Sequence, residues 1–275
     1  MTRWAVFTDL DGTLLDASTY GFEAAGPALA EAARLGVPVV PCTTKTESET
    51  RHWAEQLGLA TAFIFENGGG AAVSMRSFPE PPLPFEERDG YRVVPLAVHG
   101  APLQEGIRRI REATGGRAVF MSDLTEARIA EVTGLTPVLA ALARRRMFDE
   151  PFACDVPFPG ALVADLASLG LHLSRGGRFW HLHGDIDKGR TTRLVAGWLS
   201  AALGPLRIAG LGDSALDRPL LEASDTAIAI PRPDGSFDPE LCSGLPGLVR
   251  APAAGPAGWN RAVLDLLAGA AAPTA

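Results

Sequence analysis

The 275-residue chain is poor in cysteine and in long apolar stretches. Its three cysteines, Cys42, Cys154 and Cys242, are odd in number and lie far apart, which argues against both a disulfide framework and a zinc site. No stretch of about 20 apolar residues is present to span a bilayer, and the N-terminus lacks the cationic start and apolar run of a signal peptide. These absences predict a cytoplasmic protein with no membrane partner.

Positive charge is also scarce, and lysine is almost missing. The formal net charge of −7 argues against nucleic acid as a main partner, because phosphate backbones select basic faces. Of the 25 basic residues only Lys45 and Lys188 are lysine. An ammonium makes a compact point contact with one phosphate oxygen, whereas a guanidinium is planar and wider, so we expect these two lysines in a functional site. The alternative is that they are ordinary surface lysines.

The chain is organised around a motif near its start. Residues 5–8 have the composition of a buried strand and run directly into Asp9 and Asp11, which are followed by a Gly-Thr turn. Ligands of open α/β sheets bind at the carboxyl ends of strands, so we expect both carboxylates in a ligand crevice. Neighbouring carboxylates raise each other's pKa, and a hard divalent cation relieves this repulsion. The alternative is a simple turn at Asp11 and Gly12.

Strands and helices alternate through the first part of the chain. Strands are predicted at 37–42 and 62–65, and helices at 27–35 and 47–57. This order predicts parallel strands joined by crossover helices. Polar residues follow each strand again: Thr43 and Lys45 after one, and Glu66, Asn67 and Gly68 after the other. The glycines at 68–70 also fit a hairpin turn, which leaves Glu66 and Asn67 as the functional part.

The proline-rich stretch at 78–85 has the composition of a linker. Beyond it, strands and helices mix without the regular alternation of the first part, until a long helix begins after Asp187 and is followed by a strand at 207–211. We therefore predict an α/β protein with a Rossmann-like parallel-sheet core and an inserted α+β cap domain. The core consists of residues 1–84 and 185–275, and the cap of residues 85–184.

Four motifs stand at the ends of predicted strands or at a helix start in the two core segments. They are Asp9-Leu10-Asp11-Gly12-Thr13, Thr43, Lys188, and Gly212-Asp213-Ser214-Ala215-Leu216-Asp217. This set, in this order, resembles the haloacid dehalogenase superfamily of phosphohydrolases. The second aspartate of the first motif is similar to the phosphatase branch, since the dehalogenases lack it. The long insertion between the second and third motifs is similar to the branch with a large mixed α/β cap.

The groups in these motifs suit hydrolysis of a phosphate monoester in two steps. Asp9 is the expected nucleophile and forms an aspartyl phosphate. Asp11 protonates the leaving alkoxide and then deprotonates the attacking water. Thr43 and Lys188 neutralise the phosphoryl oxygens in the transition state.

Mg²⁺ is the expected cofactor of this reaction. Its predicted ligands are Asp9, the backbone carbonyl of Asp11, and Asp213. Asp217 belongs to the predicted metal site as well, where we expect it to hold Lys188 or a metal-bound water.

Several short motifs resemble the mannosyl-3-phosphoglycerate phosphatases more specifically. They are Thr44-Lys45-Thr46, Glu66-Asn67-Gly68-Gly69, Gly90-Tyr91-Arg92-Val93-Val94, Phe148-Asp149-Glu150-Pro151 and Gly176-Gly177-Arg178-Phe179-Trp180-His181. The resemblance implies hydrolysis of 2-O-mannosyl-3-phosphoglycerate to mannosylglycerate, a compatible solute. Leu216, where the superfamily usually has asparagine, and Met147, where the family more often has glutamate, depart from the pattern.

The expected substrate is a small sugar phosphate, bound by a protein that is a monomer or a homodimer. The expected substrate-binding residues are Lys45, Glu66, Asn67, Gly68, Arg146, Arg178 and His181. Arg178 and His181 are the leading cap residues, because a guanidinium grips a carboxylate and a histidine binds sugar hydroxyls. For the arginines, a solvated surface charge is the alternative.

Other functions remain open at this point. Within the phosphatases, the substrate is alternatively glucosyl-3-phosphoglycerate or sucrose phosphate. A sugar phosphomutase would retain the aspartyl phosphate and pass it to a sugar. A sugar-phosphate binding protein without catalysis is the alternative that is not an enzyme.

Overall fold

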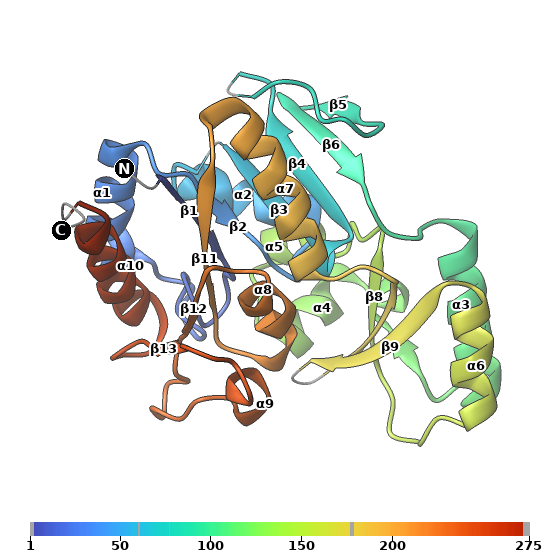
Figure 1. Ribbon diagram of the computed structural model, residues 1–275. Coiled ribbons are helices and arrows are strands. Elements are labelled where there is room, and N and C mark those ends of the chain that lie inside the picture. Colours follow the sequence, from blue (N-terminus) through green and yellow to red (C-terminus); the bar gives the residue numbers. More distant parts are fainter. Residues whose placement is uncertain (1–2, 60, 77, 177–178, 272–275) are drawn as a thin grey trace.

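The computed structural model describes residues 3–59, 61–76, 78–176 and 179–271. The first and last parts of the chain lie together in one lobe, and the middle of the chain forms a second lobe beside it (Figure 1). None of the helices in the described residues is long and apolar enough to cross a membrane.

The core lobe is built on a five-stranded parallel sheet in the order β13-β12-β11-β1-β2. Its strands are β1 (Arg3–Thr8), β2 (Val39–Pro41), β11 (Leu206–Gly212), β12 (Thr226–Ala229) and β13 (Val249–Arg250). From β1 the chain first adds β2 on one side and later β11 on the other, so the strand order reverses at β1. Such a reversal point is where open α/β sheets bind ligands.

Helices cover both faces of this sheet. They are α1 (Gly26–Leu35), α2 (Glu47–Gln56), α7 (Lys188–Leu203), α8 (Arg218–Glu222), α9 (Pro239–Cys242) and α10 (Gly255–Ala271). Trp4 and Val6 pack into the cluster that contains α1 and α10, whereas Ala5 and Phe7 pack into the cluster that contains α7 and α8. Because both faces of β1 are buried, its sequence is a continuous apolar run.

A second sheet extends the core beyond β2. Its strands, in the order β3-β4-β6-β5, are antiparallel: β3 (Ala62–Phe65), β4 (Gly70–Ser74), β5 (Glu86–Arg88) and β6 (Tyr91–Pro95). A parallel bridge between Cys42 and Ile64 joins β3 to the end of β2. The pairing of β6 with β4 places residues 86–95 against the core hairpin. We therefore propose that the cap begins after Pro95, and not at the linker near residue 85.

The cap is a four-stranded antiparallel sheet with helices. The sheet order is β7-β8-β10-β9, and its strands are β7 (Val119–Phe120), β8 (Asp149–Ala153), β9 (Leu171–Gly176) and β10 (Phe179–Gly184). The helices are α3 (Ala101–Ala113), α4 (Glu126–Thr133), α5 (Pro137–Ala143) and α6 (Gly160–Ser168). Helices α3 and α6 share one apolar cluster with the strands, which includes Ile107, Phe152 and Leu166. The predicted α/β core with an α+β cap is thereby confirmed.

Hydrogen bonds direct two segments at the boundary of core and cap. Strand β6 ends at Pro95, and the next two backbone N–H groups, of Leu96 and Ala97, donate to Gly69 O and turn the chain toward the cap. Helix α5 ends at Ala143, and Arg146 lies beyond it with its side chain only 10% exposed. Arg146 is therefore not a solvated surface charge.

Candidate active site

Asp9 follows directly after β1 and is held by Lys188 at the start of α7. The Nζ atom of Lys188 lies 2.8 Å from Oδ1 of Asp9 and 2.5 Å from Oδ1 of Asp217. Burial alone would lower the pKa of Lys188, but the carboxylates of Asp217 and Asp9 raise it above its usual value. Lys188 is therefore a permanent buried cation beside the predicted nucleophile.

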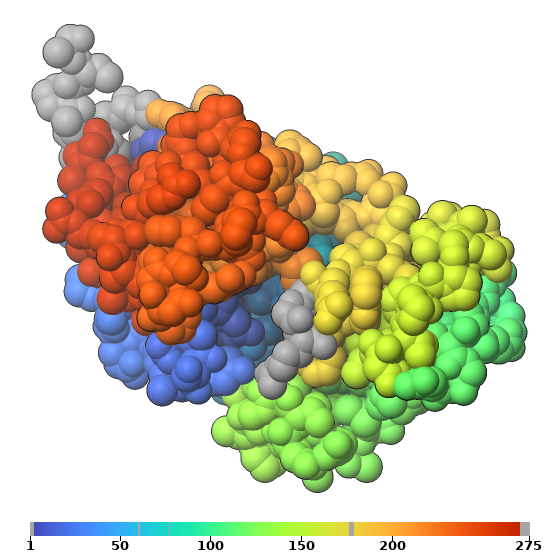
Figure 2. All heavy atoms as spheres, turned by 90° about the horizontal axis from the view of Figure 1, so that it is seen from below, coloured from blue at the N-terminus to red at the C-terminus, as the bar shows by residue number. Residues whose placement is uncertain are grey.

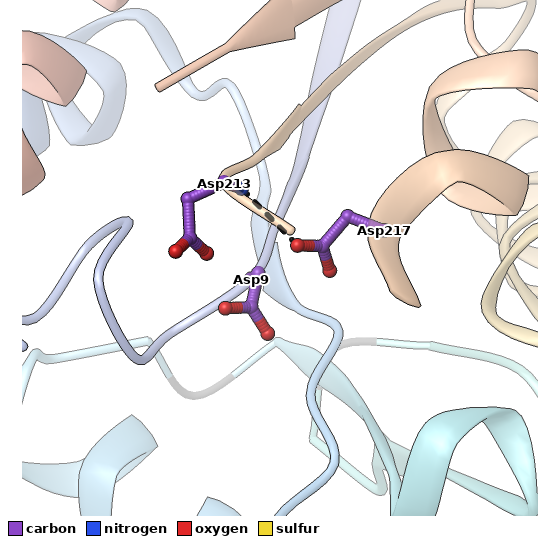
Figure 3. A group of neighbouring side chains, drawn as sticks. All are labelled: Asp9, Asp213 and Asp217. Atoms are coloured by element: carbon purple, nitrogen blue, oxygen red, sulfur yellow. Dashed lines mark hydrogen bonds between the residues drawn. The ribbon is translucent and has the colours of Figure 1, made fainter. Parts of the chain in front are cut away.

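Asp213 and Asp217 bring two further carboxylates to Asp9 from the loop after β11. Oxygen atoms of the three side chains lie within 4.8 Å of one another (Figure 3). Oδ2 of Asp217 accepts hydrogen bonds from the backbone N–H groups of Asp213 and Ser214, both at 3.1 Å. Because its other oxygen binds Lys188, Asp217 fixes the loop and the lysine together.

The crowded carboxylates disfavour each other's ionised forms. Burial and Asp217 raise the pKa of Asp9 well above its usual value, although Lys188 opposes them. Burial and Asp217 likewise raise the pKa of Asp213 to about 7. Gly12 lets the backbone pass close to Asp213, since a Cβ at Gly12 would lie 2.7 Å from Oδ2 of that residue. A hard divalent cation with oxygen ligands fits this set of donors and would relieve the repulsion.

Asp11 lies two residues after Asp9 on the loop that follows β1, and Lys45 orients its side chain. The Nζ atom of Lys45 is 2.8 Å from Oδ2 of Asp11 and 5.0 Å from the ring centre of Tyr20. Burial alone would lower the pKa of Lys45, but the carboxylates of Asp11 and Glu49 raise it. The other oxygen of Asp11, Oδ1, is buried and has no hydrogen-bond partner within the described ranges. A buried polar atom without a partner is costly, so a bound substrate or water molecule would complete the hydrogen bonding of this oxygen.

Thr43 follows β2, and its loop packs against the loop that follows β3. Thr43 is buried, and its backbone carbonyl accepts a hydrogen bond from the N–H of Asn67. The Lys45 carbonyl accepts one from the N–H of Glu66. Glu66 and Asn67 both have positive φ angles, of 45° and 58°. The two loops that carry five of the predicted site residues are thus held together by backbone hydrogen bonds.

The side chain of Glu66 points to the cap segment 147–149. Its carboxylate accepts hydrogen bonds from the backbone N–H groups of Met147, Phe148 and Asp149, at 2.7 to 3.0 Å. Burial raises the pKa of Glu66 to about 7, against the opposing effect of Arg146. These bonds occupy both carboxylate oxygens, so the structure places Glu66 in the contact between core and cap, where a direct substrate contact is not favoured.

Gly68 and Asn67 complete this loop, a short 3₁₀ turn (Glu66–Gly68) between the antiparallel strands β3 and β4. Gly68 touches the start of α7: a Cβ at this position would lie 2.5 Å from the carbonyl oxygen of Asp187. Thr191 donates a hydrogen bond to Gly68 O. Gly68 therefore serves close packing beside Lys188. Oδ1 of Asn67 is buried without a partner among the residues described.

A cavity of about 280 Å³, here called the cleft, lies between core and cap. Figure 2 shows the two lobes facing each other across the molecule, the core in blue, orange and red and the cap in green and yellow. The cleft is lined by Asp11, Tyr20, Thr44, Lys45, Glu49, Met121, Thr133, Leu135, Ala143, Arg146, Pro151, Phe179, His181 and Leu216. Its volume is near the lower end of the range for small-molecule sites, about 300 Å³.

The cleft brings together predicted residues from both lobes. Asp11 and Lys45 belong to the core wall, and Arg146 and His181 to the cap wall. Arg178, predicted to bind a carboxylate, lies outside the described residues. Leu216, which departs from the usual asparagine, places an apolar side chain in the wall of the cleft.

Sequence reasoning missed two residues of the site. Tyr20 lines the cleft and stacks on Trp53 with ring centres 5.8 Å apart, and it carries a positive φ of 59°, rare for an aromatic residue. No sequence pattern around Tyr20 predicts this backbone conformation. Asp149 contacts His181, and its only sequence signal was its place in one short motif.

The chain is similar to known hydrolases over most of its length. The family of haloacid dehalogenase-like hydrolases matches residues 6–78. A glucosyl-3-phosphoglycerate/mannosyl-3-phosphoglycerate phosphatase of Methanococcoides burtonii is 33% identical over 264 residues, which cover 95% of this chain and 96% of the relative. The protein of the same description from Persephonella marina is 32% identical over 266 residues, or 95% and 96% of the two chains.

Solved structures show the same fold at lower identity. The crystal structure of a Thermoplasma acidophilum protein superposes with a TM-score of 0.68 at 15% identity, covering 97% of this chain and 99% of the other. The resemblance inferred from the motifs is thus confirmed by relatives that match almost the whole chain. The chain belongs to the haloacid dehalogenase superfamily, in the family that includes these sugar-phosphoglycerate phosphatases, and it is a phosphoric monoester hydrolase.

Proposed function

We propose that this enzyme hydrolyses 2-O-mannosyl-3-phosphoglycerate to mannosylglycerate and phosphate, with Mg²⁺ as its cofactor. The observation that carries the proposal is the pairing of Asp9, beside the buried cation Lys188, with Asp11, whose Oδ1 is buried and unpartnered within the described ranges. Both stand at the sheet's reversal point, beside a cleft with walls from core and cap. The names of the two relatives support the class of substrate.

In the first step, a carboxylate oxygen of Asp9 attacks phosphorus, and the bond from phosphorus to the ester oxygen breaks. The electron pair of that bond goes to the leaving alkoxide, which takes a proton from Oδ1 of Asp11. Lys188 and Thr43 stabilise the charge on the phosphoryl oxygens, because a fixed cation and a fixed hydroxyl need no reorganisation during the reaction. The products of this step are an aspartyl phosphate and the free sugar glycerate.

In the second step, Oδ1 of Asp11 removes a proton from a water molecule that attacks the aspartyl phosphate. Phosphate leaves, the carboxylate of Asp9 is restored, and Asp11 holds the proton for the next cycle. The hydrogen bond that Lys45 donates to Oδ2 of Asp11 keeps that oxygen in place whether Asp11 is ionised or protonated, so that Oδ1 exchanges the proton.

Asp9, the backbone carbonyl of Asp11, and Asp213 would hold Mg²⁺. The ion would neutralise the charge that the attacking carboxylate and the phosphoryl group bring together. Asp217 supports this site by fixing both the Asp213 loop and Lys188.

The identity of the sugar and the oligomeric state are also part of the proposal. Glucosyl-3-phosphoglycerate is the second candidate substrate, because the names of both relatives contain it. Sucrose phosphate and a phosphomutase reaction are weaker alternatives. A cytoplasmic monomer or homodimer remains the prediction from sequence.

Phosphate release across a panel of substrates tests the proposal. The panel contains mannosyl- and glucosyl-3-phosphoglycerate, sucrose phosphate, mannose 6-phosphate and p-nitrophenyl phosphate. We expect the highest kcat/KM with a sugar-phosphoglycerate and turnover without a phosphorylated activator. A kcat/KM for mannose 6-phosphate or sucrose phosphate above both glycerate substrates would overturn the substrate assignment, and a requirement for a bisphosphorylated activator would indicate a mutase.

A further inference from the structure

His181 in the cap wall is held by a buried carboxylate that the proposed reaction does not use. Nδ1 of His181, on β10, lies 2.9 and 3.0 Å from the two carboxylate oxygens of Asp149 on the neighbouring strand β8. Asp149 is fully buried, and His181 is 8% exposed and lines the cleft. An ionised carboxylate only accepts hydrogen bonds, so Nδ1 carries the proton and Nε2 is the ring nitrogen available to a ligand.

Asp149 is itself fixed by residues that reach the core. Arg146 donates from Nε to the Asp149 carbonyl at 2.6 Å and from Nη2 to the carbonyl of Thr44 at 2.8 Å. The backbone N–H of Asp149 donates to Glu66 at 3.0 Å. The backbone N–H of Glu66 donates a hydrogen bond in turn to the carbonyl oxygen of Lys45. The ring of His181 is therefore oriented through a continuous buried network that begins at the loop of the predicted phosphate site.

Asp149 remains ionised at neutral pH within this network. Burial alone would raise its pKa, but the Arg146 guanidinium and the hydrogen bond that His181 donates lower it. A buried ionised carboxylate is costly unless several groups compensate it. The cleft side of the same cap wall is otherwise largely apolar, with Met121, Pro151 and Phe179 around His181. In such surroundings a single oriented nitrogen discriminates strongly between a hydroxyl and an apolar group.

We propose that Asp149 is a positioning residue that holds His181 in its Nδ1-protonated form, so that Nε2 accepts a hydrogen bond from a sugar hydroxyl of the substrate. The inference deepens the proposed function and rests on it, since the hydroxyl belongs to the sugar of the sugar phosphate. Asp9 and Asp11 perform the chemistry in the core. The Asp149–His181 pair therefore contributes to recognition of the sugar, and loss of this contact is expected to raise KM.

A double-mutant cycle tests whether Asp149 acts through His181. The variants are Asp149→Asn, His181→Gln and the double variant, with Glu47→Gln as a matched control that removes a buried, arginine-paired carboxylate elsewhere on the core. Substrates are the best sugar phosphate of the panel and p-nitrophenyl phosphate, which has no sugar. We expect each single variant to lower kcat/KM for the sugar phosphate roughly tenfold to a hundredfold, mainly through KM.

The expected effect is at least tenfold larger for the sugar phosphate than for p-nitrophenyl phosphate. The double variant is expected to be no worse than His181→Gln, because Asp149 has no role left once the imidazole is gone. Equal losses with both substrates, or additive losses in the double variant, would overturn the inference and make Asp149 a purely structural residue. The Glu47→Gln control should leave the ratio of the two substrates unchanged.

The protonation of His181 is measured independently of any substrate. Nitrogen-15 NMR of the histidine rings in the free protein, with His181 assigned by its loss in His181→Gln, distinguishes the two neutral forms. We expect the Nδ1-protonated form in the wild type and a shift toward the Nε2-protonated form in Asp149→Asn. An Nε2-protonated wild type would overturn the inference even if Asp149→Asn fails to fold. A failure of the substrate panel alone would instead reject the proposed substrate.

Discussion

Lys188→Arg tests why a chain that uses arginine almost everywhere keeps a lysine at the start of α7. One nitrogen of Lys188 contacts Asp9 and Asp217 at 2.8 and 2.5 Å, and the side chain is 1% exposed. A guanidinium keeps the charge but is planar and wider, so it cannot place one nitrogen between both carboxylates without displacing one of them. The substitution thus changes shape while it preserves charge.

The size of the effect follows from the contact that is lost. A charge-assisted hydrogen bond contributes about 1.5 to 3 kcal/mol. If the contact with Asp9 is the one broken, kcat falls roughly tenfold to over a hundredfold at 1.36 kcal/mol per factor of ten. The larger side chain also overpacks a buried site, which costs about 1 to 3 kcal/mol of folding free energy.

Steady-state kcat and the thermal unfolding midpoint measure the two effects. Lys45→Arg is the comparison: Lys45 pairs directly with Asp11 and lies over the ring of Tyr20, and a guanidinium can pair with the first and stack on the second. We expect its loss of kcat to be at least tenfold smaller. Lys188→Met removes the charge and should destabilise the fold by about 3 to 5 kcal/mol, because Asp9 and Asp217 lose their counter-ion. A Lys188→Arg variant with wild-type kcat would refute the reasoning.

Two further predictions concern the nucleophile and the metal. Asp9→Asn should lower kcat by at least about a hundredfold, or about 2.7 kcal/mol. It should keep or raise the unfolding midpoint, because burial already disfavours the ionised form of Asp9. Activity above about one per cent of wild type would contradict a covalent role. Exhaustive chelation should stop turnover, and added Mg²⁺ should restore it. Mg²⁺ should also raise the unfolding midpoint of the wild type but not of Asp213→Asn, since ligand binding stabilises only the form that holds the ligand. Full activity after chelation would reject the metal site.

The core of the site was accessible from sequence because parallel strands align their ends. Strands β1, β2 and β11 read as short apolar runs, and the polar residues after them, Asp9, Thr43 and Asp213, come to one edge whatever the rest of the chain does. The two lysines were singled out by their rarity, and each pairs with one of the predicted catalytic aspartates. For these residues, the composition of the chain and their positions at strand ends or a helix start were sufficient to single them out.

Residue contacts that form only in the tertiary structure could not be predicted from the sequence in this way. The sequence placed 86–95 in the cap, whereas we propose a cap that begins after Pro95, because β6 pairs with β4 and the sequence of an antiparallel strand does not show which sheet it joins. Glu66 follows a strand as the other site residues do, but its carboxylate turns to the backbone of 147–149. The sequence left a solvated surface charge as the alternative for Arg146, and only the fold shows that it binds the backbone carbonyls of Thr44 and Asp149.

In the proposed mechanism, the division of the site between two lobes separates chemistry from recognition. The proposed reacting groups Asp9 and Asp11 lie in the core, on a loop whose geometry the parallel sheet fixes, and Lys188 contacts Asp9 there. The cap contributes His181 through a network that touches the core only at Glu66 and Thr44 among the bonds described. Substitutions in the cap wall can therefore change which sugar is accepted without moving the nucleophile. A fold built in this way supports many phosphate esters with one chemistry, and the choice between mannosyl and glucosyl substrates should be decided by residues around His181.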